Sequence, residues 1–143
     1  MPTETIYEED LLKLYEQGER DFRQCELSIV DMERAVLADS DFSGQELEEV
    51  HLVEANLRSV KFRGCGIWQT SFHNANLQNA DFTNVKFSEV FFIGADLRNA
   101  CFRGAELREV GFMKANLNGC DFENAVLIDC VMPDGSTKTS GAT

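Results

Sequence analysis

Residues 75–84 read ANLQNADFTN, and the pattern in them extends over most of the chain. Leu77 and Phe82 are large and apolar, and an alanine stands two residues before each of them. Every fifth residue from Phe22 to Met132 is likewise large and apolar, without a break in register. An α-helix would repeat its apolar residues at a period of about 3.6, and a strand at about 2. A period of five instead predicts a backbone that turns a corner every five residues.

A second period, of twenty residues, makes equivalent positions alike. One column of centres is all Phe and a second is all Leu, and the residue two before each Leu of that column is Ala. These columns are the predicted structural core: Phe22, Phe42, Phe62, Phe82, Phe102, Phe122, Leu37, Leu57, Leu77, Leu97 and Leu117. Twenty residues per circuit predict four faces, with each residue stacked on its equivalent about 4.8 Å away.

The repeat resembles the A-[DN]-[LF]-x-x unit of the pentapeptide-repeat family. The unit stands here as Ala75-Asn76-Leu77, Ala80-Asp81-Phe82, Ala95-Asp96-Leu97 and Ala115-Asn116-Leu117. The resemblance implies an all-β solenoid, a right-handed quadrilateral β-helix, and the handedness comes from the resemblance alone. At twenty residues a coil, residues 19–133 would form about five to six coils.

The N-terminal segment, residues 1–18, is predicted to form a short capping α-helix. A solenoid exposes open backbone and core at its ends and therefore needs caps. Thr5-Ile6-Tyr7-Glu8 looks like a capping box, and Gly18 is a suitable stop signal. The expected helix spans 7–17, and its apolar stripe consists of Tyr7, Leu11, Leu14 and Tyr15. The passage from this helix into the repeats, with the exit Met132-Pro133-Asp134-Gly135, looks like cyanobacterial members of the family.

The C-terminal segment, residues 134–143, is small and polar, and we expect a disordered tail. The last coil would then present unpaired strand edges beside outward Val126, Ile128 and Val131. Such an end predicts a homodimer joined at or near the C-terminal coils. The alternative is that the tail folds back and covers the end of a monomer.

Outward apolar residues gather on the face whose centres are Leu52, Phe72, Phe92 and Phe112. The Leu-centred face, by contrast, carries polar flanking residues such as Asn76. Aligned apolar residues on one face suggest a contact surface. The protein-binding candidates, on this face and its neighbour, are Val53, Trp68, Phe91, Ile93, Met113, Val126, Ile128 and Val131.

No catalytic, cofactor-binding or metal site is expected. His51 and His73 share the apolar face, but only Ser71 and Glu33 stack near them, a poor ligand set. Four of the five cysteines occupy small inward positions, no two of them twenty apart, so disulfides are not expected. Cys101 alone points outward, and no neighbour marks it as a nucleophile. No phosphate loop, nucleophile elbow or acid–base pair is found.

The formal net charge of −12 lies entirely in residues 1–54, which hold 16 Asp and Glu against 4 Lys and Arg. This excess disfavours direct binding to nucleic acid or to an anionic membrane. No apolar run has the length of a membrane span, and no secretory signal is visible at the start. We expect a cytoplasmic protein.

Three functions are considered, and an enzyme is disfavoured because the sequence shows no catalytic site. The first is a scaffold or adaptor that binds an unknown protein partner through one face or end of the rod. The second is implied by the resemblance, because some acidic members mimic duplex DNA and protect type II topoisomerases such as DNA gyrase. The confined charge, the uninterrupted repeats and the short rod depart from those members.

Overall fold

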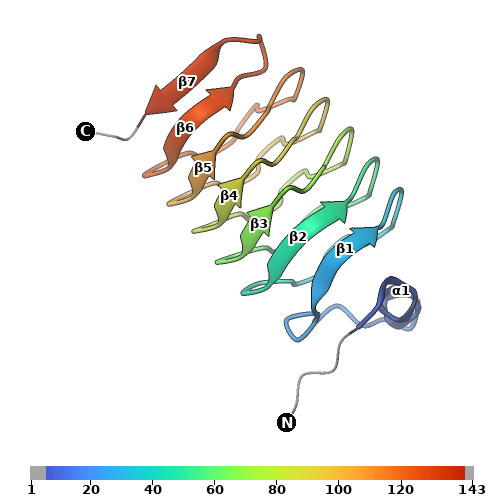
Figure 1. Ribbon diagram of the computed structural model, residues 1–143. Helices are drawn as coiled ribbons and strands as arrows, with labels where there is room; N and C mark the ends of the chain where they lie inside the picture. The colour runs from blue at the N-terminus through green and yellow to red at the C-terminus, as the bar shows by residue number, and fades with distance from the viewer. Residues whose placement is uncertain (1–5, 141–143) are drawn as a thin grey trace.

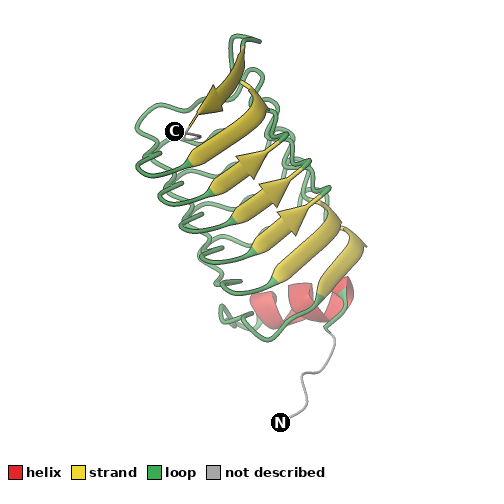
Figure 2. Cartoon of the chain, turned by 60° about the vertical axis from the view of Figure 1, so that its left-hand side comes forward, coloured by secondary structure: helices red, strands yellow, loops and turns green. Residues whose placement is uncertain are grey.

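Pairing at twenty-residue intervals builds a four-sided rod in the computed structural model, which describes residues 6–140 (Figure 1). Along one face, parallel strands pair Leu27 with Leu47, then Leu47 with Ile67, and so on to Leu127. The elements are α1 (Glu8–Glu16), β1 (Leu27–Asp31), β2 (Glu46–His51), β3 (Gly66–Trp68), β4 (Lys86–Ser88), β5 (Glu106–Arg108), β6 (Val126–Val131) and β7 (Thr137–Ser140). We call the face made by β1–β6 the strand face (Figure 2).

The other three faces are held by the same twenty-residue register. Isolated parallel bridges join, for example, Asp81 with Cys101, Asn76 with Asp96 and Phe91 with Gly111. Backbone hydrogen bonds follow this register, with the Phe82 N–H donating to the Cys101 carbonyl at 2.7 Å. The predicted β-solenoid with a short N-terminal helix is thereby confirmed.

Like side chains stack on like inside the rod. The rings of Phe62 and Phe82 lie 5.4 Å apart at 9°, and those of Phe82 and Phe102 lie 5.0 Å apart at 15°. A second Phe stack, Phe72 on Phe92 at 4.9 Å and 7°, meets the first edge to face. Offset stacked and edge-to-face geometries are those that aromatic rings prefer. The core is therefore a set of continuous columns that run the length of the rod.

The predicted core residues are buried except at the last coil. Phe122 and Leu117 are only partly buried, since no further coil lies beyond them. The N-terminal end differs because α1 packs there and Leu11 is fully buried. The two ends of the rod are thus covered to different extents.

Helix α1 ends in the motif that Gly18 predicts. Gly18 has φ +99°, its N–H donates to the Tyr15 carbonyl, and the Glu19 N–H donates to the Leu14 carbonyl. This pair of bonds is the Schellman pattern. The Tyr15 hydroxyl donates to the Ala38 carbonyl at 2.9 Å, and this bond attaches the helix to the first coil next to Leu37.

Two expectations about the start of α1 need correction. Tyr7 was expected on the buried stripe but is 70% exposed, because it is the N-cap, with extended backbone outside the helix. Its side chain makes no capping hydrogen bond. The proposed capping box begins two residues before the observed N-cap Tyr7, and its Thr5 lies outside the described residues.

The prediction of a disordered tail over 134–143 is wrong for 134–140. Residues Thr137–Ser140 form β7, which pairs antiparallel with β6, and the Asp129 N–H donates to the Thr139 hydroxyl. A tight turn precedes it, in which the Asp134 carboxylate accepts the Ser136 N–H and hydroxyl. The open edge of β6 offers backbone partners, so even small polar residues become ordered there. Residues 141–143 lie outside the described part.

We predict that Leu77→Ala or Phe82→Ala lowers the free energy of unfolding by about 3–5 kcal/mol, because each leaves a cavity between two like neighbours. The control is Gln78→Ala, which alters an outward side chain and should cost less than about 0.5 kcal/mol. Urea titrations of the three variants measure this difference. Equal losses at Leu77 and Gln78 would contradict the inward and outward assignment.

Candidate protein-binding face

The candidate face has the inward centres Met32, Leu52, Phe72, Phe92, Phe112 and Met132, and two outward columns flank them. One outward column runs His51, Ser71, Phe91, Gly111 and Val131, joined by parallel bridges. The other contains Val53, His73, Ile93, Met113 and Pro133. Phe91 and Met113 are 43% and 41% exposed, while Val53, Ile93 and Val131 are half-buried. The structure thus brings five of the predicted binding residues onto one face.

Phe91 is the most prominent of these residues. Its ring lies over Gly111 of the next coil, where an added Cβ would meet the ring at 3.1 Å. On the other side the His73 ring lies 6.4 Å away, and the Ser71 hydroxyl is hydrogen-bonded to His73 Nδ1. The absence of a side chain at Gly111 lets the aromatic ring lie flat along the rod rather than project from it.

A surface groove runs beside Phe91, at the corner between the candidate face and the strand face. Its volume is about 310 Å³, and its apolar floor consists of Phe91, Val110, Gly111 and Val131. One side of the groove is an acidic wall formed by Glu89, Glu109 and Asp129. We call this feature the corner groove.

The remaining candidates lie on the strand face, in two places. Val126 and Ile128 flank the centre of β6 and line a hollow of about 300 Å³ with Phe87 and Arg108. Trp68 lies three coils away, at the end of β3, and its indole covers Gly66. The predicted set is therefore not one continuous surface.

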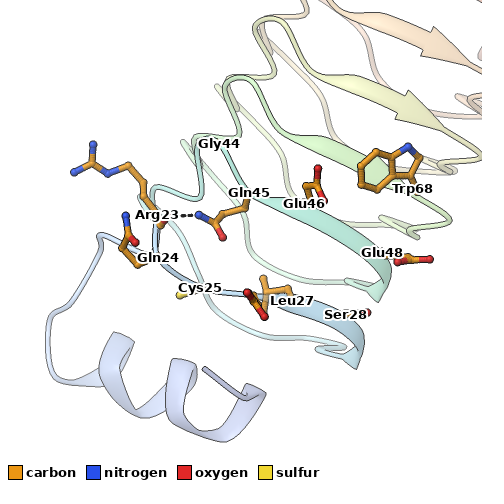
Figure 3. A pocket seen from close by; sticks show the side chains of 11 residues that line it. Arg23, Gln24, Cys25, Leu27, Ser28, Gly44, Gln45, Glu46, Glu48 and Trp68 are labelled. Carbon is orange, nitrogen blue, oxygen red and sulfur yellow. Dashed lines mark hydrogen bonds between the residues drawn. The ribbon is translucent and has the colours of Figure 1, made fainter. Parts of the chain in front are cut away.

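Trp68 borders a separate hollow near the N-terminal end (Figure 3). This hollow has a volume of about 410 Å³, and its lining includes the carboxylates of Glu26, Glu46 and Glu48. Gln45 stands where the repeat places a small inward residue, and its amide donates instead to the Arg23 carbonyl. Gln45, a long polar residue at a position that the core pattern otherwise fills with a small one, therefore lines this hollow.

Sequence reasoning missed two exposed apolar residues of the first coils. Ile29 is 75% exposed at φ +53°, and Val36 is 52% exposed on the Leu face that was expected to be polar. Comparison down the twenty-residue columns could have found both residues. The positions equivalent to Ile29 hold Glu49, Gln69, Glu89, Glu109 and Asp129, and Val36 stacks over Asn56.

The Leu face beyond the first coil carries a polar surface with internal pairing. Arg98 donates to both carboxylate oxygens of Asp96, at 2.9 and 2.7 Å, and this lowers the pKa of Asp96. Further along, the Asn116 side chain accepts the Asn118 N–H. Side chains satisfied by their own neighbours leave little unpaired chemistry for a ligand.

Residues 6–140 contain no cluster of metal ligands and no disulfide. No group of three or more His, Cys, Asp or Glu side chains there could hold a metal ion. All five cysteines are free, and three inward thiols donate to carbonyls of the preceding coil, such as Cys65 to Phe42 at 3.1 Å. Cys101 is half-buried beside the Thr83 hydroxyl at 3.3 Å.

Stacked coils that place their varied residues on flat outer faces define the class of solenoid repeat proteins. The family model for the pentapeptide repeat region matches residues 19–92, and that for pentapeptide repeats (8 copies) matches 75–112 and 105–133. The chain therefore belongs to the pentapeptide repeat family. Its solved members share a right-handed quadrilateral β-helix.

Solved structures support the same fold at low sequence identity. The cyanobacterial protein Rfr23 from Cyanothece 51142 is 20% identical, with a TM-score of 0.51 over 85% of this chain and 92% of that one. QnrB1, a plasmid-mediated fluoroquinolone resistance protein, is 15% identical. Its TM-score is 0.59, and the match covers 73% of this chain and 58% of QnrB1. A pentapeptide repeat protein of the Arabidopsis thaliana thylakoid lumen is 18% identical. Its TM-score is 0.51, and the match covers 76% of this chain and 68% of that protein. A search of curated proteins found no match.

Within the described residues, the short helix α1 is neither long nor apolar enough to cross a membrane.

We predict a thiol-dependent loss of stability at alkaline pH. Burial raises the pKa of Cys65 from 9.0 to about 11. Because the folded pKa is raised, the stabilising contribution of the neutral thiol is complete below pH 9 and is lost as pH rises from about 9 to 11. The variant Cys65→Ala copies Ala105 of the same column. Between about pH 8 and pH 11, its melting temperature should therefore fall by less than that of wild type. Equal losses in thermal denaturation would contradict this.

Proposed function

We propose that this protein is a non-catalytic scaffold or adaptor that binds another protein through the candidate face. The observation that carries the proposal is the difference between two adjacent faces of one regular rod. The candidate face exposes Phe91 and Met113, whereas the Leu face beyond its first coil carries paired polar residues. Large exposed apolar residues aligned on one side favour a protein contact.

The rigidity of the rod supports this role. The backbone of Phe91 is bridged to the coils before and after it, at Ser71 and Gly111, and Phe72, Phe92 and Phe112 stack directly beneath the face. A surface held in its bound shape loses little conformational entropy on association. Such a face suits an adaptor that holds a partner without changing its own fold. The five free cysteines favour a cytoplasmic location, where thiols stay reduced.

The DNA-mimic function remains a second proposal, favoured by the acidic rod. The excess charge lies in α1 and the first two coils, while residues 55–143 carry equal numbers of acidic and basic side chains. A duplex mimic needs negative charge along its length. Inhibition of DNA gyrase supercoiling by the purified protein would favour this proposal over the first.

The homodimer stays a prediction, but its expected contact changes. The unpaired edge of β6 on which it rested is occupied by β7. The apolar end of the last coil is still only partly covered: Leu117 is partly buried, and partly buried Phe122 and Met132 line a hollow of about 160 Å³. Light scattering at high concentration, with Phe122→Glu as the comparison, measures whether two rods meet there.

Affinity capture from a lysate of the source organism tests the scaffold proposal. The face variant Phe91→Ser with Met113→Ser changes two exposed residues, so the rod should fold and melt as wild type does. The matched control, Asn76→Ser with Gln78→Ser, alters the Leu face. We expect the amount of protein retained by wild type and by the control to fall at least about tenfold with the face variant, since a few contact residues carry most of the binding energy. Equal capture by all three proteins would contradict the proposal.

A further inference from the structure

The corner groove combines an apolar floor with an acidic wall along the same line of the rod. Phe91 and Val131 form the floor in alternate coils, with buried Val110 and Gly111 between them. Glu89, Glu109 and Asp129 stand beside them in three successive coils, and all three are exposed. The carboxylates therefore repeat on every rung, whereas the apolar side chains of Phe91 and Val131 stand on the first and third rungs with Gly111 between them.

Two of the three residues of the acidic wall occupy positions where the backbone favours other residues. Glu89, Glu109 and Asp129 have φ values of +56°, +54° and +55°. Asn and Gly accept this conformation most easily, and the corner after the Leu face accordingly carries Asn79, Asn99 and Gly119. Within the described coils, the corner that bears the groove has neither Asn nor Gly at this position. The turn geometry therefore does not account for the long side chains of Glu89 and Glu109, whereas Asp129 is a residue that tolerates it.

The three carboxylates also lack compensation by cations. Ion pairs occur elsewhere on the rod, as between Arg103 and Asp121 at 3.2 Å. In residues 6–140, none of the basic nitrogens lies within 4.0 Å of a carboxylate oxygen of Glu89, Glu109 or Asp129. Arg108, the nearest cation in sequence, flanks the strand-face centre Leu107 instead. Like charges stacked in register repel one another, so a cationic partner would gain from filling the groove.

The spacing of the rungs indicates which backbone fits along the groove. Two rungs advance about 9.6 Å along the rod. Two turns of α-helix advance about 10.8 Å, whereas four residues of extended chain advance about 13 Å. A helix lying along the groove can thus place successive turns opposite successive carboxylates, within the reach of Lys and Arg side chains. An extended chain falls out of register by the third rung.

We propose that the corner groove binds a basic amphipathic α-helix of a partner protein. The apolar residues of the helix, at i, i+4 and i+7, contact Phe91, Gly111 and Val131. Its Lys or Arg residues, on the adjacent edge, pair with Glu89, Glu109 and Asp129. This inference rests on the proposed function and names the chemistry of the partner at the candidate face.

A designed peptide tests the inference directly. The probe is a fluorescein-labelled helix of about 16 residues with Leu on one stripe and Lys on the next. A scrambled peptide of the same composition disperses both stripes. The groove variant is Glu89→Gln with Glu109→Gln and Asp129→Asn. The control variant, Glu16→Gln with Glu26→Gln and Glu33→Gln, removes the same charge from exposed positions outside the groove.

Fluorescence anisotropy at physiological ionic strength should show the striped peptide bound by wild type. The groove variant should weaken this binding at least about tenfold and the control by less than about twofold, because exposed charges beyond a Debye length are screened. Equal binding of the scrambled peptide, or equal weakening by the control, would show attraction by net charge only and overturn the inference. If wild type does not bind the peptide while lysate capture still depends on Phe91 and Met113, this inference fails and the scaffold proposal stands.

Discussion

In-register parallel pairing at twenty residues is the constraint on which the rest of this structure depends. The register from Leu27 to Leu47 to Ile67 on the strand face recurs on all four faces. Along the rod axis, each residue therefore packs against its own equivalents about 4.8 Å above and below it. Inside, this favours columns of one residue type, such as the Phe stack with ring separations from 4.9 to 5.5 Å. Outside, the same register aligns surface residues into straight columns.

Those external columns explain how so regular a fold can acquire a specific surface. A single exposed aromatic residue is an ordinary feature of a protein surface. Phe91 differs because the register places Gly111 and Val131 directly along its column and three carboxylates along the neighbouring one. The binding chemistry then repeats with the period of the backbone, and a partner must match that period. The proposal of a helical partner rests on this matching rather than on any single contact.

The sequence predicted the core and the four-sided path because both depend only on residues five and twenty apart. It could not predict the ends, where that register stops. Tyr7 has the spacing of a buried stripe residue yet lies outside the helix, and residues 137–140 look like a polar tail yet complete the edge of β6. The candidate face was predicted through Phe91 and Met113. The acidic wall was missed because Glu89 and Glu109 read as ordinary turn residues until the columns were compared.

Excision of repeats measures most directly whether the twenty-residue register holds the rod together. Removal of residues 61–80 takes one member from every column and leaves all remaining columns in register. Removal of residues 66–70 takes only one five-residue unit, but at the junction it sets Phe72 against Leu47 and Phe82 against Leu57. Thermal denaturation followed by circular dichroism should show a cooperative transition for the larger excision and a much lower melting temperature for the smaller one. A smaller excision that is the more stable of the two would contradict the account.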